Sequence, residues 1–267
     1  MDDELMANCR PLRSLLDLPA SRWREVLDHK TGAGYRGDQI ANWVFKHGVF
    51  SFDDMENVPQ KLRRDLATRY TVAPPEVAAR FESVDGTQRF LLELQDGQKV
   101  ESVYMPYSDR VTLCISSQVG CRFACTFCQT GSMGLQRSLT AGEIVGQVLR
   151  LRAERGWLSR PVNVVFMGQG EPLDNIDAVI PAIQALQDPA GPGLSWRRIT
   201  VSTVGIVSAI QRLSEMGDSR PRLAVSLNAS TDEVRSEIMP INRRWPIEVL
   251  LSALRDVDWR KGERVTF

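Results

Sequence analysis

The feature that most constrains the fold is a regular alternation of strand-like and helix-like segments that starts after Asp109. Short apolar runs rich in β-branched residues alternate there with longer segments of helical periodicity. The predicted strands are residues 111–116, 162–167, 199–203 and 223–227, and the predicted helices are residues 141–155, 176–186, 207–216, 231–238 and 246–257. This order is typical of an α/β fold with a parallel sheet, either open or barrel-like.

The residues before this region follow two other patterns. Residues 1–75 read as a small helical bundle, with helices predicted over residues 16–28, over residues 38–46 and after Pro59. Residues 76–108 read as a β-hairpin connector, because two strand-like runs flank Asp96-Gly97, a frequent hairpin turn. Residues 109–267 then form the α/β core.

The composition of the chain indicates its cellular location and its net charge. The sequence has no apolar run of about 18 residues, and acidic residues occupy the N-terminus, where a signal peptide needs basic ones. We therefore expect a cytoplasmic protein without membrane spans. Lys plus Arg equals Asp plus Glu at 33 each, so RNA contact would depend on local basic groups. Such groups are Arg22/Arg24, Lys61/Arg63/Arg64, Arg197/Arg198 and Arg243/Arg244, each of which also suits a solvated surface.

A cysteine cluster follows the first predicted strand of the core. Cys121, Cys125 and Cys128 have the spacing C-x3-C-x2-C. Thiolates hold iron–sulfur clusters, and three of them leave one iron of a 4Fe–4S cube open. That iron can chelate the amine and carboxylate of S-adenosylmethionine (SAM). A loop at the C-terminal end of a strand is also where barrel enzymes place their chemistry.

Two other interpretations of the cysteines stay open at this point. A structural zinc ion takes four ligands, usually as two separated pairs. Cys114 lies close to the three clustered cysteines, whereas His29 and His47 lie far upstream. Buried cysteines without a metal are the second alternative. The spacing favours the iron–sulfur cluster over both.

The wider sequence resembles the RlmN/Cfr family of radical SAM adenine methyltransferases. The similarity starts with the run from Cys114 through the three clustered cysteines to Ile144. It continues in family order with Met-Gly-Gln-Gly-Glu-Pro-Leu (167–173), Val-Ser-Thr-Val-Gly (201–205), Ser-Leu-Asn-Ala (226–229) and Met-Pro-Ile-Asn-Arg-Arg (239–244). Together these motifs are far more specific than any one of them.

The resemblance implies a TIM-like radical SAM barrel, incomplete in this chain, with Cys121, Cys125 and Cys128 as ligands of the 4Fe–4S cluster. It further implies a SAM site formed by Gly170, Glu171, Ser202, Ser226, Leu227 and Asn228. Without the family, the glycine and glutamate would equally suit a tight strand–helix turn. The serines and the asparagine would suit helix capping.

The resemblance also implies roles for Glu101 and Cys114. Glu101 matches a proton acceptor, a role for which burial would bring its pKa toward the operating pH; alone it would read as a solvated strand residue. Cys114 matches a thiol that resolves a covalent enzyme–RNA adduct by disulfide exchange with a second cysteine. The alternative for Cys114 is a buried apolar cysteine.

The family's second cysteine lies near its C-terminus, but here nothing follows Phe267, and Cys9 is at the opposite end. The last five residues, 263–267, look like the start of another strand. We therefore expect a chain truncated at its C-terminus. Such a chain should bind the cluster and SAM without producing methylated RNA.

The implied function is methylation of carbon 2 of an adenine in 23S rRNA and in tRNA, with a donor such as flavodoxin supplying electrons. The N-terminal helices resemble the family's accessory RNA-binding domain. One alternative is methylation of carbon 8, as in Cfr-like antibiotic resistance. Another is a non-catalytic, zinc-stabilised RNA-binding module. The position of the methyl group on the adenine distinguishes carbon-8 from carbon-2 methylation. The metal content of the protein distinguishes the zinc-stabilised module from the iron–sulfur enzyme.

Overall fold

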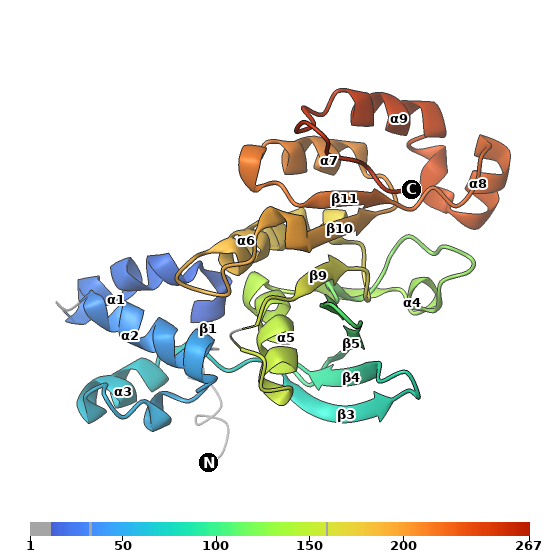
Figure 1. The fold of residues 1–267 in the computed structure, drawn as a ribbon. Coiled ribbons are helices and arrows are strands. Elements are labelled where there is room, and N and C mark those ends of the chain that lie inside the picture. The colour runs from blue at the N-terminus through green and yellow to red at the C-terminus, as the bar shows by residue number, and fades with distance from the viewer. Residues whose placement is uncertain (1–11, 32–33, 159) are drawn as a thin grey trace, which may run out of the picture.

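The computed structural model describes residues 12–31, 34–158 and 160–267. Their largest sheet has seven strands in the order β11-β10-β9-β6-β5-β4-β3 (Figure 1). The strands β6 (Val111–Cys114), β9 (Asn163–Phe166), β10 (Ile199–Thr203) and β11 (Arg222–Val225) are parallel neighbours. The predicted α/β fold with a parallel sheet is thereby confirmed, and the sheet is open rather than closed into a full barrel.

The helices of the core lie close to their predicted positions. They are α5 (Ala141–Glu154), α6 (Ile176–Gln187), α7 (Val207–Ser214), α8 (Asp232–Ile238) and α9 (Ile247–Arg255). Short 3-10 turns accompany them: η5 (Pro172–Asn175), η6 (Trp196–Arg198), η7 (Gly217–Ser219) and η8 (Pro240–Arg243). Helices α5 and α6 pack together, as do α7 and α9. Alternate strand residues such as Val164, Phe166 and Val201 are fully buried, whereas their neighbours are half-buried, so one face of the sheet is more open.

The predicted hairpin is confirmed at Asp96-Gly97, between β4 (Gln88–Glu93) and β5 (Lys99–Pro106). It does not stand apart from the core. Strand β5 pairs with β6, and β3 (Glu76–Glu82) pairs with β4, so three antiparallel strands extend the parallel sheet. This pairing satisfies the backbone groups that an edge at β6 would leave exposed.

The N-terminal region contains α1 (Trp23–Thr31), α2 (Tyr35–Asn42), which continues into a π-helical turn (Trp43–His47), η4 (Phe52–Asp54) and α3 (Gln60–Ala67). The first predicted helix begins later than expected. Two 3-10 turns, η1 (Leu15–Asp17) and η2 (Ala20–Arg22), precede α1. Pro19 separates them, because its ring disfavours helical backbone in the residue before it. Strands β1 (Arg13–Ser14) and β2 (Tyr70–Thr71) pair in parallel at the base of this region.

The N-terminal region packs tightly against α5. Oδ1 of Asp17 accepts a hydrogen bond of 2.6 Å from the Gly142 N–H at the start of α5. A Cβ at Gly142 would lie 2.8 Å from Oγ of Ser14, and one at Gly146 would lie 2.6 Å from Cδ of Pro75. Two glycines on one face of α5 therefore allow the chain before the sheet to approach this helix closely.

The C-terminal residues continue the parallel order. Thr266 forms a single parallel bridge with Ala224 of β11, and the Val225 N–H donates 2.7 Å to the Thr266 carbonyl. The strand start that the sequence predicts here is thus present as one bridge. Among the described helices, none combines the length and the apolar character needed to cross a membrane.

Candidate functional site

The three clustered cysteines lie in a loop between two strands that the sequence analysis did not predict. Strand β7 (Gln118–Gly120) pairs with β8 (Leu135–Ser138), and the connection between them contains the cysteines and the short helix α4 (Gln129–Ser132). The Cys121 N–H donates to the Gly134 carbonyl at 3.1 Å, which closes the base of the loop. Gly120 has a φ of 79°, and a Cβ there would lie 1.8 Å from that same carbonyl oxygen. Only glycine fits this position.

Two contacts hold the cysteine loop against the core. The Thr126 N–H donates to the Ile238 carbonyl at 3.0 Å, at the end of α8. Nε of Arg122 lies 2.9 Å from a carboxylate oxygen of Asp174 in η5. Figure 1 accordingly shows α4 and its loop beside α8, on the far side of the core from the N-terminal helices.

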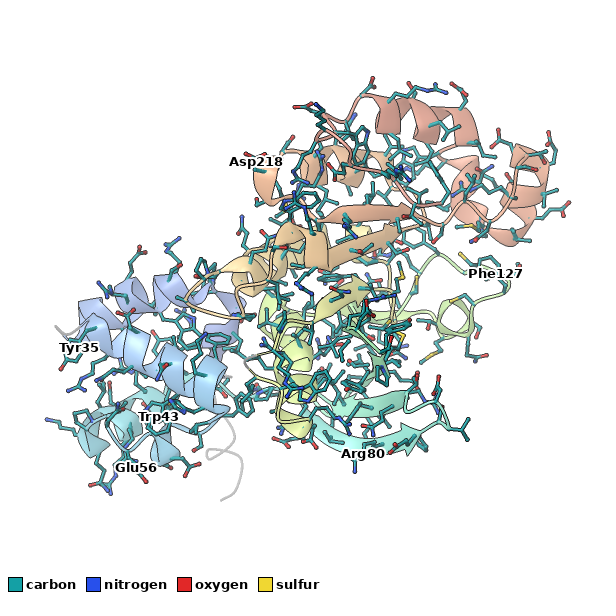
Figure 2. The ribbon with its side chains drawn as sticks, viewed as in Figure 1. Tyr35, Trp43, Glu56, Arg80, Phe127 and Asp218 are labelled. Atoms are coloured by element: carbon teal, nitrogen blue, oxygen red, sulfur yellow. The ribbon has the colours of Figure 1, made fainter. Side chains whose placement is uncertain are left out.

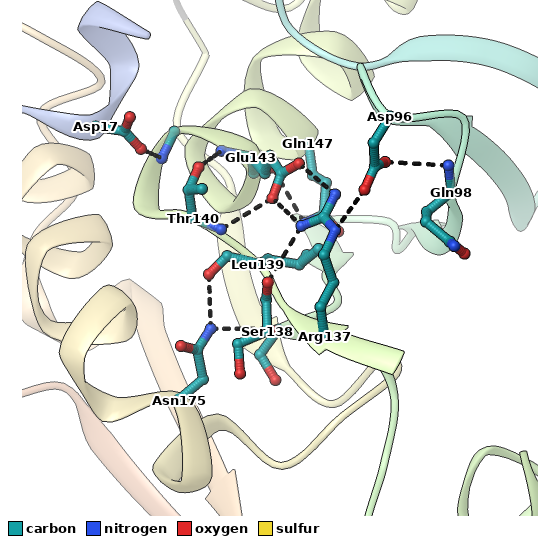
Figure 3. Close-up of polar contacts among 12 residues, drawn as sticks. Asp17, Asp96, Gln98, Arg137, Ser138, Leu139, Thr140, Glu143, Gln147 and Asn175 are labelled. Carbon is teal, nitrogen blue, oxygen red and sulfur yellow. Dashed lines mark hydrogen bonds and ion pairs between the residues drawn. The ribbon is translucent and has the colours of Figure 1, made fainter. Parts of the chain in front are cut away.

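A polar network fixes the end of β8, after the loop (Figure 3). The Arg137 guanidinium donates to both carboxylate oxygens of Glu143, each at 2.8 Å, and to Asp96 at 2.6 Å. Glu143 also accepts from the Thr140 N–H, and the Thr140 hydroxyl accepts from the Glu143 N–H, which forms a capping box at the start of α5. Arg137 therefore joins the cysteine hairpin to α5 and to the β4–β5 turn.

The four described cysteines are free thiols, and Cys9 lies outside the described residues. No two of these four form a disulfide, and the second cysteine that the resemblance implied as the partner of Cys114 is not one of them. Burial, together with the negative charges of Cys121, Cys128 and Glu171, raises the pKa of Cys125 to about 11. Burial also raises the pKa of Cys121, where Glu171, Cys128 and Asp174 act in the same direction. The protonation of Cys121 and Cys125 therefore depends on the charges of the other groups around the loop.

The donor set fits an iron–sulfur cluster in its chemistry. Three soft sulfur donors from one loop are half-buried and free, as a cluster with one open iron requires. The raised pKa values of Cys121 and Cys125 mean that a bound cation would displace protons from these two thiols. Within residues 12–31, 34–158 and 160–267, no group of three His, Cys, Asp or Glu side chains is arranged to hold a single metal ion. The fit therefore rests on ligand type and proximity, and not on a preformed geometry.

The sheet register places the other predicted residues on its more open face. Cys114 at the end of β6 lies opposite Val103, two residues from Glu101 in β5. Since side chains two residues apart share a face, Glu101 and Cys114 point to the same side. The parallel register carries this face through β9 to Ser202 in β10. Oγ of Ser226 then lies 3.5 Å from Oγ of Ser202.

Gly170 and Glu171 follow β9, and both contact neighbouring segments of the protein. Gly170 has a φ of 95°, and a Cβ there would lie 2.6 Å from the Cβ of Gln118. The close approach that requires glycine at this position is therefore to Gln118 of β7. Glu171 is 3% exposed, and its two oxygens accept from the Leu173 N–H at 3.1 Å and the Val204 N–H at 2.9 Å. Burial raises the pKa of Glu171 to about 7.

The loop after β11 contains the predicted residues Ser226, Leu227 and Asn228. Asn228 has a left-handed backbone with a φ of 58°, and its amide lies 3.3 Å from the Met239 sulfur. The buried Arg235 of α8 donates to the carbonyls of Ser226 at 3.3 Å and Leu227 at 3.0 Å. The sequence analysis missed Arg235, because a charged residue within a short helix reads as solvent-exposed.

The surroundings of Glu101 and Cys114 differ from those that their predicted roles suggested. The Glu101 side chain is 39% exposed and pairs with Arg89 at 3.0 Å, so the burial expected for a proton acceptor is not present. Its backbone is nevertheless fixed, because its N–H donates to Gln169 and its carbonyl accepts from Ser116. Burial raises the pKa of Cys114 to about 11. A thiol with that pKa is protonated near neutral pH and needs a base to react.

Two large cavities lie away from these residues. One cavity of about 620 Å³ lies between the N-terminal region and the core, and is lined by residues such as Ser14, Pro74 and Glu143. The other, of about 520 Å³, lies by the starts of β10 and β11 and is lined by Arg222 and Arg260, among others. Neither of these two cavities is lined by a predicted site residue.

Comparisons with known proteins agree with this arrangement. Residues 115–265 match the radical SAM superfamily, and residues 13–72 match the ribosomal RNA large subunit methyltransferase N-terminal domain. The dual-specificity RNA methyltransferase RlmN 2 of Myxococcus xanthus is 47% identical over 91% of this chain and 66% of its own length. The RlmN of Dinoroseobacter shibae is 46% identical over 87% of this chain and 61% of its own length. The chain thus spans less than two thirds of either relative.

A solved structure extends the comparison to three dimensions. The crystal structure of a radical SAM methyltransferase from Sphaerobacter thermophilus matches with a TM-score of 0.90 and 41% sequence identity. The match covers 96% of this chain and 75% of that one.

Proposed function

Since the chain belongs to the RlmN family of the radical SAM superfamily, we propose that it is a cytoplasmic radical SAM RNA methyltransferase. Its substrate would be carbon 2 of an adenine in 23S rRNA and in tRNA. The observation that carries this proposal is the position of the three-cysteine loop, which is bonded to α8 and η5 at the end of the parallel strands. Glu171, Ser202 and Ser226 lie at the same C-terminal ends of the parallel strands.

Cys121, Cys125 and Cys128 would hold the 4Fe–4S cluster through their thiolates. When bound, the cluster with SAM supplies the radical chemistry that an unreactive aromatic carbon needs. The protein contributes the position of the three thiols. The loop that carries the cysteines is fixed at its base by Gly120 and Gly134 and at its tip by α8.

SAM would lie along the strand ends, against Gly170, Glu171, Ser202 and the loop from Ser226 to Asn228. The hydroxyls of Ser202 and Ser226 lie side by side and can donate to a polar ligand. Glu171 already accepts two backbone hydrogen bonds, so its part would be to hold the Val204 and Leu173 backbone beside the ligand. Any direct contact would use its remaining lone pairs.

Glu101 and Cys114 would face the adenine from the same side of the sheet. The raised pKa of Cys114 implies that its thiol acts only with a neighbouring base. Glu101 is the carboxylate on that face in the adjacent strand, two residues from the partner of Cys114. Its ion pair with Arg89 would have to open before Glu101 could accept a proton.

The RNA would contact the exposed basic residues of the N-terminal region and the open face. Arg22 and Arg24 are paired with Glu25 and Asp38, so they offer less charge than the sequence indicated. Lys61 and Arg64 of α3 are exposed and could meet phosphates. A donor such as flavodoxin would supply electrons to the cluster.

Anaerobic reconstitution with iron and sulfide tests the metal site. The chain should become brown and hold about four irons, and variants with alanine at Cys121, Cys125 and Cys128 should hold none. Alanine at Cys114 is the matched control and should leave the iron content unchanged. A colourless protein with one zinc per chain would support the zinc-stabilised module instead.

Deletion of the gene in its own cells tests the reaction. Digestion of 23S rRNA and tRNA followed by mass spectrometry should show loss of 2-methyladenosine, and complementation with the complete gene should restore it. Loss of 8-methyladenosine would identify the carbon-8 reaction. Unchanged adenine methylation in both RNAs would refute the proposed substrate.

A further inference from the structure

Arg235 is a buried cation whose hydrogen bonds all go to uncharged groups. Its side chain, in the middle of α8, is 0% exposed. Nε donates to the Leu227 carbonyl at 3.0 Å, and Nη2 donates to the carbonyls of Val204 at 2.7 Å and Ser226 at 3.3 Å. Nη1 donates to the amide oxygen of Asn242 at 2.7 Å. Across the part of the chain that the structure describes, no carboxylate lies within ion-pair distance of Arg235.

A charge buried in this way usually has a compensating partner. Arg220, for comparison, is 3% exposed and pairs with Glu263 at 2.8 Å. Burial lowers the pKa of Arg235, and the negative charges of Asp232 and Cys125 act in the opposite direction. Cys125 is one of the three proposed cluster ligands, so the guanidinium lies close enough to the cysteine loop to sense its charge.

The position of Arg235 is held from several elements. It bonds the chain after β10 at Val204 and the chain after β11 at Ser226 and Leu227. The amide of Asn242 is itself fixed by donation to Asp232 and Ser236. The cysteine loop meets the same helix where the Thr126 N–H donates to the Ile238 carbonyl. A fixed positive charge is thus bonded to the ends of two strands, and the helix that carries it is bonded to the cysteine loop.

We propose that Arg235 is a positioning residue that sets the charge balance of the cluster site, and that its fixed positive charge favours the reduced, more negative form of the cluster. The inference rests on the proposed function, because it needs a cluster bound by Cys121, Cys125 and Cys128. The potential of an iron–sulfur cluster depends on its net charge and surroundings. A cation held in the helix that is bonded to the cysteine loop therefore makes uptake of one electron from an external donor easier.

The test is a redox titration of the reconstituted chain, followed by the spectroscopic signal of the reduced cluster. Arg235→Gln should lower the ratio of reduced to oxidised cluster at a fixed potential by at least tenfold, which is 59 mV for a one-electron couple. Arg235→Lys keeps the positive charge but lacks the planar guanidinium. The ratio of reduced to oxidised cluster in this variant should be close to that of the wild type. Asp232→Asn removes a negative charge beside Arg235 and should shift the ratio in the opposite direction.

Arg152→Gln is the matched control. Arg152 is also buried and donates to the carbonyls of Trp157, Leu158 and Arg160, but it lies at the end of α5, toward the opposite edge of the sheet. This variant should leave the ratio unchanged. Unfolding curves of each variant without the cluster report its folding, and Asp232→Asn, at a partly exposed site, keeps the test available if Arg235→Gln does not fold.

Three outcomes are distinguishable. Wild-type protein without iron would overturn the proposed function itself. A cluster whose ratio is the same in wild type, Arg235→Gln and Asp232→Asn would overturn the inference and leave the function standing. Equal shifts in Arg235→Gln and Arg235→Lys would also overturn it, because geometry alone would then explain the effect.

Discussion

At the residue scale, Gly170 shows how a motif glycine can serve the fold. Gly170→Ala should destabilise the protein, because alanine meets both a left-handed backbone, φ 95°, and the Gln118 backbone N at 2.7 Å. Gly97→Ala is the control, since Gly97 has a φ of 80° and no atom within 4 Å of the added Cβ. We expect a loss of about 1 kcal/mol for Gly97→Ala and about 2 kcal/mol more for Gly170→Ala, measured by urea unfolding. Equal losses would contradict a packing role.

Glu171 should make stability depend on pH. Its pKa is raised from 4.5 to about 7 by burial, so the folded state binds a proton more tightly than the unfolded state between these values. Stability should therefore fall as pH rises from about 4.5 to about 7, by roughly 3 kcal/mol in total.

Unfolding of wild type and Glu171→Gln at pH 5 and pH 8 checks this dependence. The amide does not titrate, so the variant should lose that part of the pH dependence. The pKa values of Asp96 and Asp232 are lowered, so those carboxyls titrate below this range and do not interfere. An identical pH dependence in both proteins would show that Glu171 is not responsible.

At the element scale, the hairpin that carries the cysteine loop depends on Arg137. Arg137→Ala removes bonds to Glu143 and Asp96 from a side chain that is 30% exposed. We expect a loss of about 1–2 kcal/mol and faster hydrogen exchange in β7 and β8. Arg255→Ala breaks an exposed pair with Glu248 and should cost less than about 0.5 kcal/mol. Unchanged exchange in β7 and β8 would contradict the anchoring role of Arg137.

At the scale of the whole molecule, the N-terminal region covers part of the core. Deletion of residues 1–75 would expose the α5 face at Gly142 and Gly146 and remove the buried Leu15 and Leu16. We expect the remaining chain to unfold at a lower temperature in a thermal scan. An unchanged melting temperature would show that the region is only an appendage.

RNA binding is better tested on the intact chain. Replacement of Lys61 and Arg64 by glutamate should weaken RNA binding, measured at fixed salt, because two exposed positive charges become negative. Their exposure means that the melting temperature should stay within about a degree of wild type, in keeping with small surface effects. Replacement of Arg255 and Lys261 provides a control for total charge.

The sequence by itself determined the helices and strands of the core and the grouping of three thiols in one loop. Hydrophobic periodicity placed the core strands and helices within a few residues of their final bounds, because it records which side chains each element buries. The C-x3-C-x2-C spacing identified the three thiols, since one loop brings them together without help from the rest of the chain. The hairpin at Asp96-Gly97 followed from turn chemistry in the same local way.

Only the tertiary structure decided how these parts combine. Pairing of β5 with β6 joined the hairpin to the sheet, and this depends on contacts between distant segments. The partners of Gly170, Glu171 and Glu101 come from other strands, so local sequence could not reveal burial for one carboxylate and exposure for the other. Arg235 is the clearest case, because its four acceptors follow β10, β11 and α8 and meet only in the folded chain.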